Sequence, residues 1–183
     1  MINIIVFLGP SASGKSTLRN KFKFKKVVTY TTRAPRKDEV DARDYNFTDR
    51  AELLRMNRDG ELLECIEYNG NLYGTGVKSF ENIIENREIV SVVVDKNGAM
   101  KLKAIFGKKV IVIGVATPKA ECIKRMKSRG DDSMEARLAL FAQETQDTYR
   151  ISDIIINNSQ EHWDKSLQVI SIIQDGIIKQ SLE

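Results

Sequence analysis

The chain has 183 residues, of which 42% are hydrophobic and 30% charged, with a formal net charge of +4. This length suits one compact domain with a sizeable core. The sequence holds no apolar run of about 18 residues and no signal-peptide pattern at its N-terminus, so we expect no membrane partner. Cys65 and Cys122 lie far apart without histidines at ligand spacing, and we expect ordinary thiols in the cytoplasm.

The excess of basic residues could indicate nucleic-acid binding. They are densest between Arg19 and Lys37, however, with no aromatic stacking platform and no helix-turn-helix spacing beside them. A phosphorylated small molecule explains them more simply, and we expect no nucleic-acid partner.

The first 17 residues contain a phosphate-binding pattern. The apolar run over 2–8 predicts a buried strand, and Gly9, Gly14, Lys15 and Ser16 follow it as G-x-x-x-x-G-K-[ST]. The glycines let backbone N–H groups point at an anion, and the next helix adds its positive end. We expect Lys15 to reach the β- and γ-phosphates of a nucleoside triphosphate and the Ser16 hydroxyl to bind Mg²⁺.

The remaining elements follow in order. We predict a short helix over 15–22, a strand through FKFKKVVTY and a loop-rich stretch over 30–48. Asp49 and Glu52 have capping-box spacing for a helix that ends at Asp59-Gly60, and ELLECIEYNGNLYGTG predicts a hairpin around Asn69-Gly70. The rest alternates: helix 77–86, strand EIVSVVVD, helix 97–105, strand KKVIVIGVA, a helix from Thr117-Pro118 to Arg129, helix 133–149, strand 151–156 and a last helix through Trp163 and Ile173.

Buried strands that alternate with helices predict an α/β fold, with a parallel sheet covered on both faces. Residues 30 to about 76 interrupt this order and suggest an inserted lobe. Ligands bind at the C-terminal ends of the strands in such folds, so the loop after residue 8, Asp95 and the segment after Ala116 should surround one crevice.

Arginines and a phenol in the inserted segment suit a phosphate monoester. Arg33 and Arg36 are three residues apart and Tyr45 follows in DYNF. A guanidinium matches phosphate oxygens bidentately, although surface arginines are more often simply solvated.

Two carboxylates in apolar strands, Glu64 and Asp95, need hydrogen-bond donors. A guanine ring offers N1–H and an exocyclic amine on one edge, and Thr29 and Thr75 could serve its acceptor atoms. The alternative is that both acids pair with nearby Lys or Arg.

Further arginines suit phosphoryl transfer. Arg125 and Arg129 are one helical turn apart and Arg137 lies beyond the GDDS break, where a mobile segment could bring them to the transferring oxygens. They could equally form a basic solvated surface. Asn157 could touch a purine or be only a turn residue.

The motifs GPSASGKST, TTRAPRKDEVDARDYNF, ELLECIEYNGNLYGTG, VVVDKNGA, KRMKSRG and IIINN occur in this order, and with them the whole chain resembles guanylate kinase. The resemblance implies a three-layer P-loop nucleoside monophosphate kinase fold. Its parts would be a core (1–29, 77–128 and 138–183), a GMP-binding lobe (30–76) and a short lid (129–137).

The resemblance also implies a role for each matching residue. ATP would be bound by Gly9, Pro10, Ser11, Ala12, Ser13, Gly14, Lys15, Ser16, Thr17 and Asn157. GMP would be bound by Thr29, Arg33, Arg36, Tyr45, Glu64, Tyr73, Thr75 and Asp95. Lys15, Arg125, Arg129 and Arg137 would be catalytic, with Mg²⁺ on Ser16.

The chain also departs from the family pattern. Val93 stands where the family usually has an aspartate, the lid and the helix after the P-loop are short, and Ala12 and Ala42 replace common glycines. These changes concern catalytic rate and ATP affinity more than recognition of GMP.

We hypothesise an ATP-dependent kinase that converts GMP to GDP, as a monomer or homodimer. One rival is a related kinase with another acceptor, such as a ribose bisphosphate. Another is a guanylate-kinase-like binding domain that does not turn over nucleotide, although its phosphate-binding loop would then be expected to have lost Lys15 or Ser16.

Overall fold

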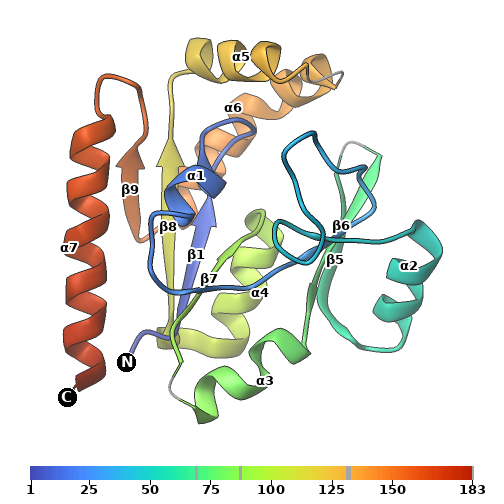
Figure 1. The fold of residues 1–183 in the computed structure, drawn as a ribbon, viewed down its shortest axis with the longest axis vertical. Helices are drawn as coiled ribbons and strands as arrows, with labels where there is room; N and C mark the ends of the chain where they lie inside the picture. The colour runs from blue at the N-terminus through green and yellow to red at the C-terminus, as the bar shows by residue number, and fades with distance from the viewer. Residues whose placement is uncertain (69, 87, 131–132, 183) are drawn as a thin grey trace.

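A computed structural model describes residues 1–68, 70–86, 88–130 and 133–182, and their strands form two sheets (Figure 1). The core sheet has the order β2-β7-β1-β8-β9, and all its paired strands are parallel. Its strands are β1 (Ile4–Leu8), β2 (Lys25–Lys26), β7 (Val90–Val93), β8 (Val110–Ala116) and β9 (Ile154–Asn157).

The second sheet lies beside the core and has the order β4-β3-β6-β5. Its strands are β3 (Tyr30–Thr31), β4 (Asn46–Phe47), β5 (Leu62–Tyr68) and β6 (Asn71–Gly76). The helices are α1 (Lys15–Arg19), α2 (Arg50–Arg58), α3 (Lys78–Glu85), α4 (Lys96–Phe106), α5 (Lys119–Ser128), α6 (Met134–Ile151) and α7 (Trp163–Leu182), with a 3₁₀ turn at Gly107–Lys109.

The side chains of β1 alternate between two hydrophobic clusters, because successive residues of a strand face opposite sides of the sheet. Ile4, Val6 and Leu8 pack with residues of α3 and α4, whereas Ile5 and Phe7 pack with residues of α1 and α7. The sheet is therefore the middle of three layers, and the predicted α/β fold with a parallel core sheet is confirmed.

The strand order places the phosphate-binding loop at the centre of the core sheet. β1 pairs with β7 on one side, where Phe7 is opposite Val93, and with β8 on the other, where Leu8 is opposite Gly114. The segments that follow β1, β7 and β8 consequently leave the sheet at the same edge, as expected for a switch point of an α/β sheet.

The strand predicted through FKFKKVVTY is wrong as one element. The chain forms β2 at the edge of the core sheet, leaves it after Lys26, and forms β3 in the second sheet. The alternating pattern does not come from one continuous strand. It arises because Phe22 and Val27 are buried in the core, while Thr29 is buried near the second sheet. The helix predicted over 15–22 is also shorter than expected, since α1 ends at Arg19.

Other predicted elements differ mainly at their ends. α6 continues to Ile151, so β9 begins at Ile154 rather than at Ile151, and Pro118 caps α5 instead of forming its first turn. The cap of α2 is confirmed, because the Asp49 side chain accepts a hydrogen bond of 2.8 Å from the Glu52 backbone N–H. The predicted hairpin is present as β5 paired antiparallel with β6, although Asn69 at its turn lies outside the described residues.

In the part of the chain that the structure describes, no helix combines the length and apolar character needed to cross a bilayer.

Two glycines allow a paired test of the packing. A Cβ on Gly114, which is buried in β8, would lie 2.5 Å from both Ile155 Cδ1 and Ser152 Oγ. We expect Gly114→Ala to lower the free energy of unfolding by about 1–3 kcal/mol through overpacking. Gly176 in the exposed part of α7 has no heavy atom within 4 Å of such a Cβ, so Gly176→Ala should raise it by about 0.5–1 kcal/mol. Urea unfolding of both variants measures this, and a loss of stability at both positions would contradict it.

Candidate functional site

A cavity of about 230 Å³ opens at the C-terminal edge of the core sheet, where the second sheet faces the loop after β1. It brings together most of the residues predicted from the sequence: Gly9, Ser11, Ala12, Gly14, Lys15, Ser16, Thr17, Thr29, Arg33, Arg36, Tyr45, Glu64, Tyr73, Thr75, Asp95, Arg129 and Arg137. Pro10, Ser13, Arg125 and Asn157 are not among its lining residues. Residues 131 and 132 of the predicted lid lie outside the described part of the chain.

The loop from Gly9 to Gly14 has the close backbone packing that its glycines predict. Gly14 adopts a φ of +91° immediately before α1, and a Cβ on Gly9 would lie 2.6 Å from the Val115 carbonyl oxygen. Ala12 has a φ of 62°, a left-handed conformation in which a Cβ is strained. A glycine, which the family resemblance implies at this position, would avoid this strain.

Lys15 points back over its own loop. Its ammonium donates hydrogen bonds to the Gly9 carbonyl oxygen at 2.7 Å and to the Pro10 carbonyl oxygen at 2.9 Å. Burial lowers the pKa of Lys15 to about 8, and the charge of Glu144 opposes this shift. A desolvated cation whose hydrogen bonds go to neutral carbonyl groups is suited to receive an anion.

The rear of the loop is held by three side chains that converge on one carbonyl group. The Ser13 carbonyl oxygen accepts hydrogen bonds from Thr117 Oγ1 at 2.8 Å, Asn158 Nδ2 at 2.7 Å and the Arg125 guanidinium at 3.2 Å. These contacts fix the loop from the side opposite the cavity, with the N–H groups of the loop left for a ligand.

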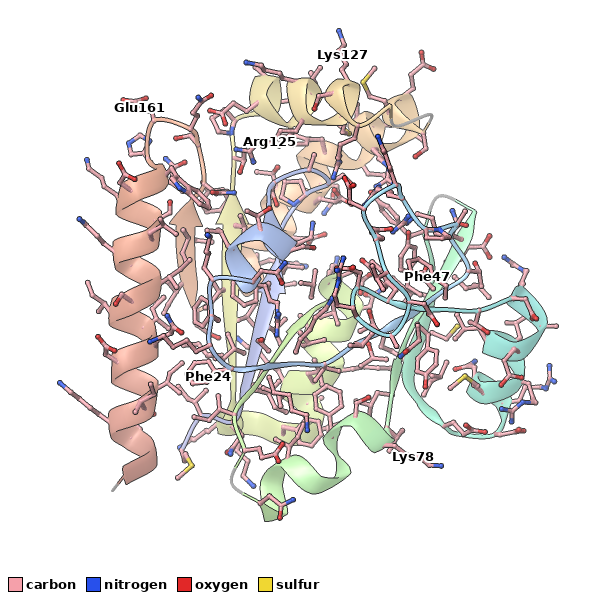
Figure 2. The ribbon with its side chains drawn as sticks, viewed as in Figure 1. Phe24, Phe47, Lys78, Arg125, Lys127 and Glu161 are labelled. Carbon is pink, nitrogen blue, oxygen red and sulfur yellow. The ribbon has the colours of Figure 1, made fainter. Side chains whose placement is uncertain are left out.

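The structure therefore places Arg125 behind the loop rather than in the cavity. Figure 2 shows it directed from α5 toward the chain that precedes α1, whereas Lys127 on the same helix points away from the molecule. Its guanidinium also donates to Glu121 at 3.0 Å and to the Asn158 carbonyl oxygen at 2.9 Å. The sequence predicts no role in the site for Thr117, which it places at a helix start, or for Asn158, which ends the motif IIINN.

Glu64 and Thr75 lie directly opposite each other in β5 and β6. The Thr75 hydroxyl donates to Glu64 Oε1 at 2.7 Å, whereas Glu64 Oε2 is buried and has no hydrogen-bond partner among the described residues. Burial raises the pKa of Glu64 to about 7, and the charge of Asp95 adds to this effect. An unsatisfied buried acceptor indicates that a donor on a ligand belongs there.

Asp95 has two roles. Its Oδ1 atom accepts a hydrogen bond of 2.9 Å from the Gly98 backbone N–H and so caps α4. The side chain also reaches the cavity, and burial raises its pKa. The cap fixes the carboxylate at the end of β7, close to Glu64.

The predicted phosphate-binding arginines are oriented by Glu39, which the sequence reading missed. Arg33 NH2 donates to both carboxylate oxygens of Glu39 at 2.8 and 2.9 Å, and the Arg36 backbone N–H donates to Glu39 at 2.8 Å. Burial acts to raise the pKa of Glu39, but the hydrogen bonds from Arg36 and Arg33 outweigh it and lower the pKa. The signal that could have found Glu39 is its position three residues after Arg36.

Two tyrosines complete this side of the cavity. The guanidinium carbon of Arg33 lies 5.5 Å from the centre of the Tyr45 ring, and Tyr45 packs edge-on against Tyr73 at 6.2 Å between ring centres. Burial raises the pKa of Tyr45, so its hydroxyl remains a hydrogen-bond donor at neutral pH.

Arg137 reaches the other side of the cavity from α6. It donates to Ser133 Oγ at 2.8 Å and to Ser11 Oγ at 3.1 Å, while the Ser11 backbone N–H donates to Glu144 at 3.1 Å. Arg129 also lines the cavity, whereas Asn157 lines a separate hollow with Pro10 and Tyr149.

The donor set of the cavity fits a magnesium ion that arrives with a triphosphate. The Ser16 side chain is exposed at the start of α1 and lines the cavity. The described residues contain no group of three or more His, Cys, Asp or Glu that could form an all-protein cage. Mg²⁺ commonly takes few protein ligands and completes its shell with phosphate oxygens and water. Val93, which also lines the cavity, offers no ligand.

Comparisons with known proteins agree with this geometry. The family model described as guanylate kinase matches residues 1–174. A guanylate kinase of Anaplasma phagocytophilum is 36% identical over 168 residues, which cover 86% of this chain and 80% of that protein. A guanylate kinase of Nitrosomonas europaea is 31% identical over 185 residues, covering 96% of this chain and 90% of that protein.

The fold is similar to a solved structure as well. The crystal structure of guanylate kinase from Anaplasma phagocytophilum superposes with a TM-score of 0.74 at 28% sequence identity. The match covers 96% of this chain and 86% of that one.

Glu39 should stabilise the free protein as well as orient the arginines. The side chains of Arg33 and Glu39 are only 12% and 16% exposed, so we expect Glu39→Gln to lower the free energy of unfolding by about 2 kcal/mol at neutral pH. Because folding lowers the pKa of Glu39, this contribution is complete above its ordinary value of 4.5 and is lost as the pH falls through the folded value.

Urea unfolding at neutral and acid pH measures this contribution, and the difference between wild type and variant should narrow in acid. The matched control is Glu67→Gln, since Glu67 and Arg50 form an ion pair with side chains 52% and 51% exposed. It should leave stability nearly unchanged. Equal losses in the two variants would contradict the assignment.

Proposed function

The chain belongs to the guanylate kinase family, and from this premise we propose how its residues bind GMP and ATP and act on them. The activity of the family is ATP-dependent phosphorylation of GMP to GDP, and this chain is a nucleoside monophosphate kinase. The residue assignments below are our proposal.

The unpartnered oxygen of Glu64 carries the assignment of the base. Guanine presents N1–H and an exocyclic amine on one edge, and two donors suit the carboxylates of Glu64 and Asp95. Adenine has an unprotonated N1 at that edge and would place an acceptor against an acid. Thr29 would donate to a guanine acceptor, and Thr75 would do so by turning toward the base the one hydroxyl proton that it donates to Glu64 at 2.7 Å in the free protein.

The GMP phosphate would lie between Arg33, Arg36, Tyr45 and Tyr73. Glu39 keeps Arg33 in a fixed orientation, so part of the ordering cost is met before GMP binds. Guanidinium donors that remain directed into the cavity match phosphate oxygens bidentately.

The triphosphate of ATP would bind on the loop from Gly9 to Thr17. The backbone N–H groups of the loop and the N-terminus of α1 stabilise its negative charge. Lys15 would exchange its two carbonyl partners for phosphate oxygens. The negative charge of the phosphates would offset the cost of burying the ammonium charge. Ser16 would hold Mg²⁺, which neutralises phosphate charge when bound, and Asn157 would lie near the adenine.

Phosphoryl transfer needs positioning and charge stabilisation rather than a covalent intermediate. A GMP phosphate oxygen would attack the γ-phosphorus in line. Arg129 and Arg137 line the cavity and would stabilise the transferring oxygens. Arg125 would act on the same step through the loop, because it holds the Ala12 and Ser13 carbonyl groups.

We propose the same division of the chain as the sequence suggests: a core, a GMP-binding lobe over 30–76 and a lid over 129–137 that close on the substrates. A cytoplasmic location, a monomeric or homodimeric state and the absence of nucleic-acid partners stay predictions.

A panel of nucleoside monophosphates in a coupled assay tests the acceptor. GMP should exceed AMP in kcat/KM by at least about 10³-fold, and IMP, which lacks the exocyclic amine, should fall between them. Equal phosphorylation of all three nucleotides, or turnover only of a sugar phosphate, would contradict GMP as the acceptor. Absence of ADP release with GMP at any Mg²⁺ level would indicate a binding domain that does not turn over nucleotide.

The raised pKa of Glu64 predicts a pH dependence of GMP affinity. The free protein holds a proton on Glu64 below about pH 7, and guanine binding must release it. The affinity for the guanine ligand should therefore fall about tenfold for each unit that the pH is lowered below about 7. Calorimetric titration with guanosine, which has no phosphate of its own to ionise, measures this step. Glu64→Gln should bind guanosine more weakly and without the step, whereas an unchanged profile in that variant would contradict the assignment.

A further inference from the structure

Tyr68 lies at the C-terminal end of β5 and contacts the phosphate-binding loop from the second sheet. Its hydroxyl oxygen is 2.9 Å from Ser11 Oγ, a contact between residues 57 positions apart in the chain. Neither the motifs of the sequence nor the binding roles proposed above give Tyr68 a function.

Ser11 connects this tyrosine to α6. Its hydroxyl accepts a hydrogen bond from Arg137 NH1 at 3.1 Å, and its backbone N–H donates to Glu144 at 3.1 Å. The guanidinium carbon of Arg137 also lies 5.7 Å from the centre of the Tyr68 ring. We call these four residues, Ser11, Tyr68, Arg137 and Glu144, the Ser11 cluster.

Hydrogen-bond chemistry makes the Ser11 hydroxyl the centre of this cluster. A guanidinium can only donate, so Ser11 Oγ acts as an acceptor for Arg137 and can still donate to, or accept from, Tyr68. Burial, with the charge of Glu144 adding to it, raises the pKa of Tyr68 to about 12. The phenol is therefore protonated at neutral pH and completes a neutral hydrogen bond rather than an ion pair with Arg137.

The cluster joins three parts of the protein that bind different groups. Tyr68 belongs to the sheet that holds Glu64 and Thr75, Ser11 belongs to the loop that holds Lys15, and Arg137 comes from the helix after the lid. Arg137 also donates to Ser133 Oγ at 2.8 Å, at the lid end of α6. Its hydrogen bond to Ser11 links its orientation across the cavity to the loop, and the same Ser11 hydroxyl bonds Tyr68.

We infer that Tyr68 is a positioning residue, which links closure of the GMP-binding sheet over the phosphate-binding loop to the placement of Arg137 for phosphoryl transfer. The inference rests on the proposed role of Arg137. Without the Tyr68 hydroxyl, the residues that bind GMP are unchanged. The hydrogen bond from the second sheet to Ser11 is lost, however, and with it the link between the position of that sheet and the position of Arg137.

Kinetics of Tyr68→Phe test this directly, because the variant keeps the ring and removes one hydroxyl. We expect kcat with GMP to fall about three- to tenfold, which corresponds to one neutral hydrogen bond, while the KM for GMP changes less than about twofold. Ser171→Ala is the matched control, since it also removes one hydroxyl, from an exposed position of α7 outside the cavity, and it should match wild type.

A double-mutant cycle separates this role from a general packing effect. Ser11→Ala removes the same contact from the other side, so Ser11→Ala with Tyr68→Phe should lose little more than Ser11→Ala alone. Losses that multiply would overturn the inference, as would an unchanged kcat in Tyr68→Phe. Thermal unfolding midpoints of all variants show whether they fold, and the Ser11 side of the cycle remains readable if Tyr68→Phe is destabilised.

Binding gives a readout without turnover. Calorimetry measures the affinity of a non-hydrolysable ATP analogue with Mg²⁺, in the absence and presence of GMP. We expect GMP to tighten analogue binding in wild type and in Ser171→Ala, and this coupling to shrink several-fold in Tyr68→Phe. Equal coupling in all three proteins would refute the link, whereas wild-type protein inactive toward GMP would instead refute the proposed function.

Discussion

The structure depends on holding an irregular backbone loop rigid, with its N–H groups left unblocked for an anion. Peptide groups that turn their N–H groups forward turn their carbonyl groups backward, and buried carbonyl groups need donors. The Ser13 carbonyl oxygen takes three, from Thr117 after β8, Asn158 after β9 and Arg125 in α5. The parallel sheet delivers the first two to the same edge as the loop, and α5 places the third. The strand order and the chemistry of the loop are thus parts of one constraint.

The two ends of the cavity use burial with opposite signs. Burial lowers the pKa of Lys15 at the loop and raises the pKa of Glu64 at the second sheet. Each group is left incompletely satisfied, Lys15 by neutral carbonyl groups and Glu64 by an unpartnered oxygen. Under the proposed function, a phosphate would supply what Lys15 lacks and a guanine edge what Glu64 lacks. Selectivity would then follow from the cost of leaving such groups unpaired with the wrong ligand.

The departures from the family pattern lie on both sides of the cavity: Val93 and Ala12 beside the proposed ATP site, and Ala42 in the segment proposed to bind GMP. Val93 lines the cavity without a ligand for a cation, so the metal would rely on Ser16, phosphate oxygens and water. Ala12 and Ala42 adopt φ values of 62° and 59°, in which a Cβ costs roughly 1 kcal/mol. None of these departures falls on a side chain that we propose to bind guanine or the GMP phosphate. Under the proposed roles they concern ATP and metal binding more than recognition of GMP.

The sequence by itself determined the phosphate-binding loop, the alternation of buried strands and helices, and most of the cavity residues. These are local signals: a glycine spacing, an apolar period, and charged or hydroxyl side chains at motif positions. Tertiary structure alone decided that FKFKKVVTY divides between two sheets and that Arg125 supports the loop from behind. It also decided that Glu39 contacts Arg33, and that Thr117, Asn158 and Tyr68 contact the loop. Such contacts join segments whose approach depends on strand order and on hydrogen-bond satisfaction, neither of which leaves a periodic trace in the chain.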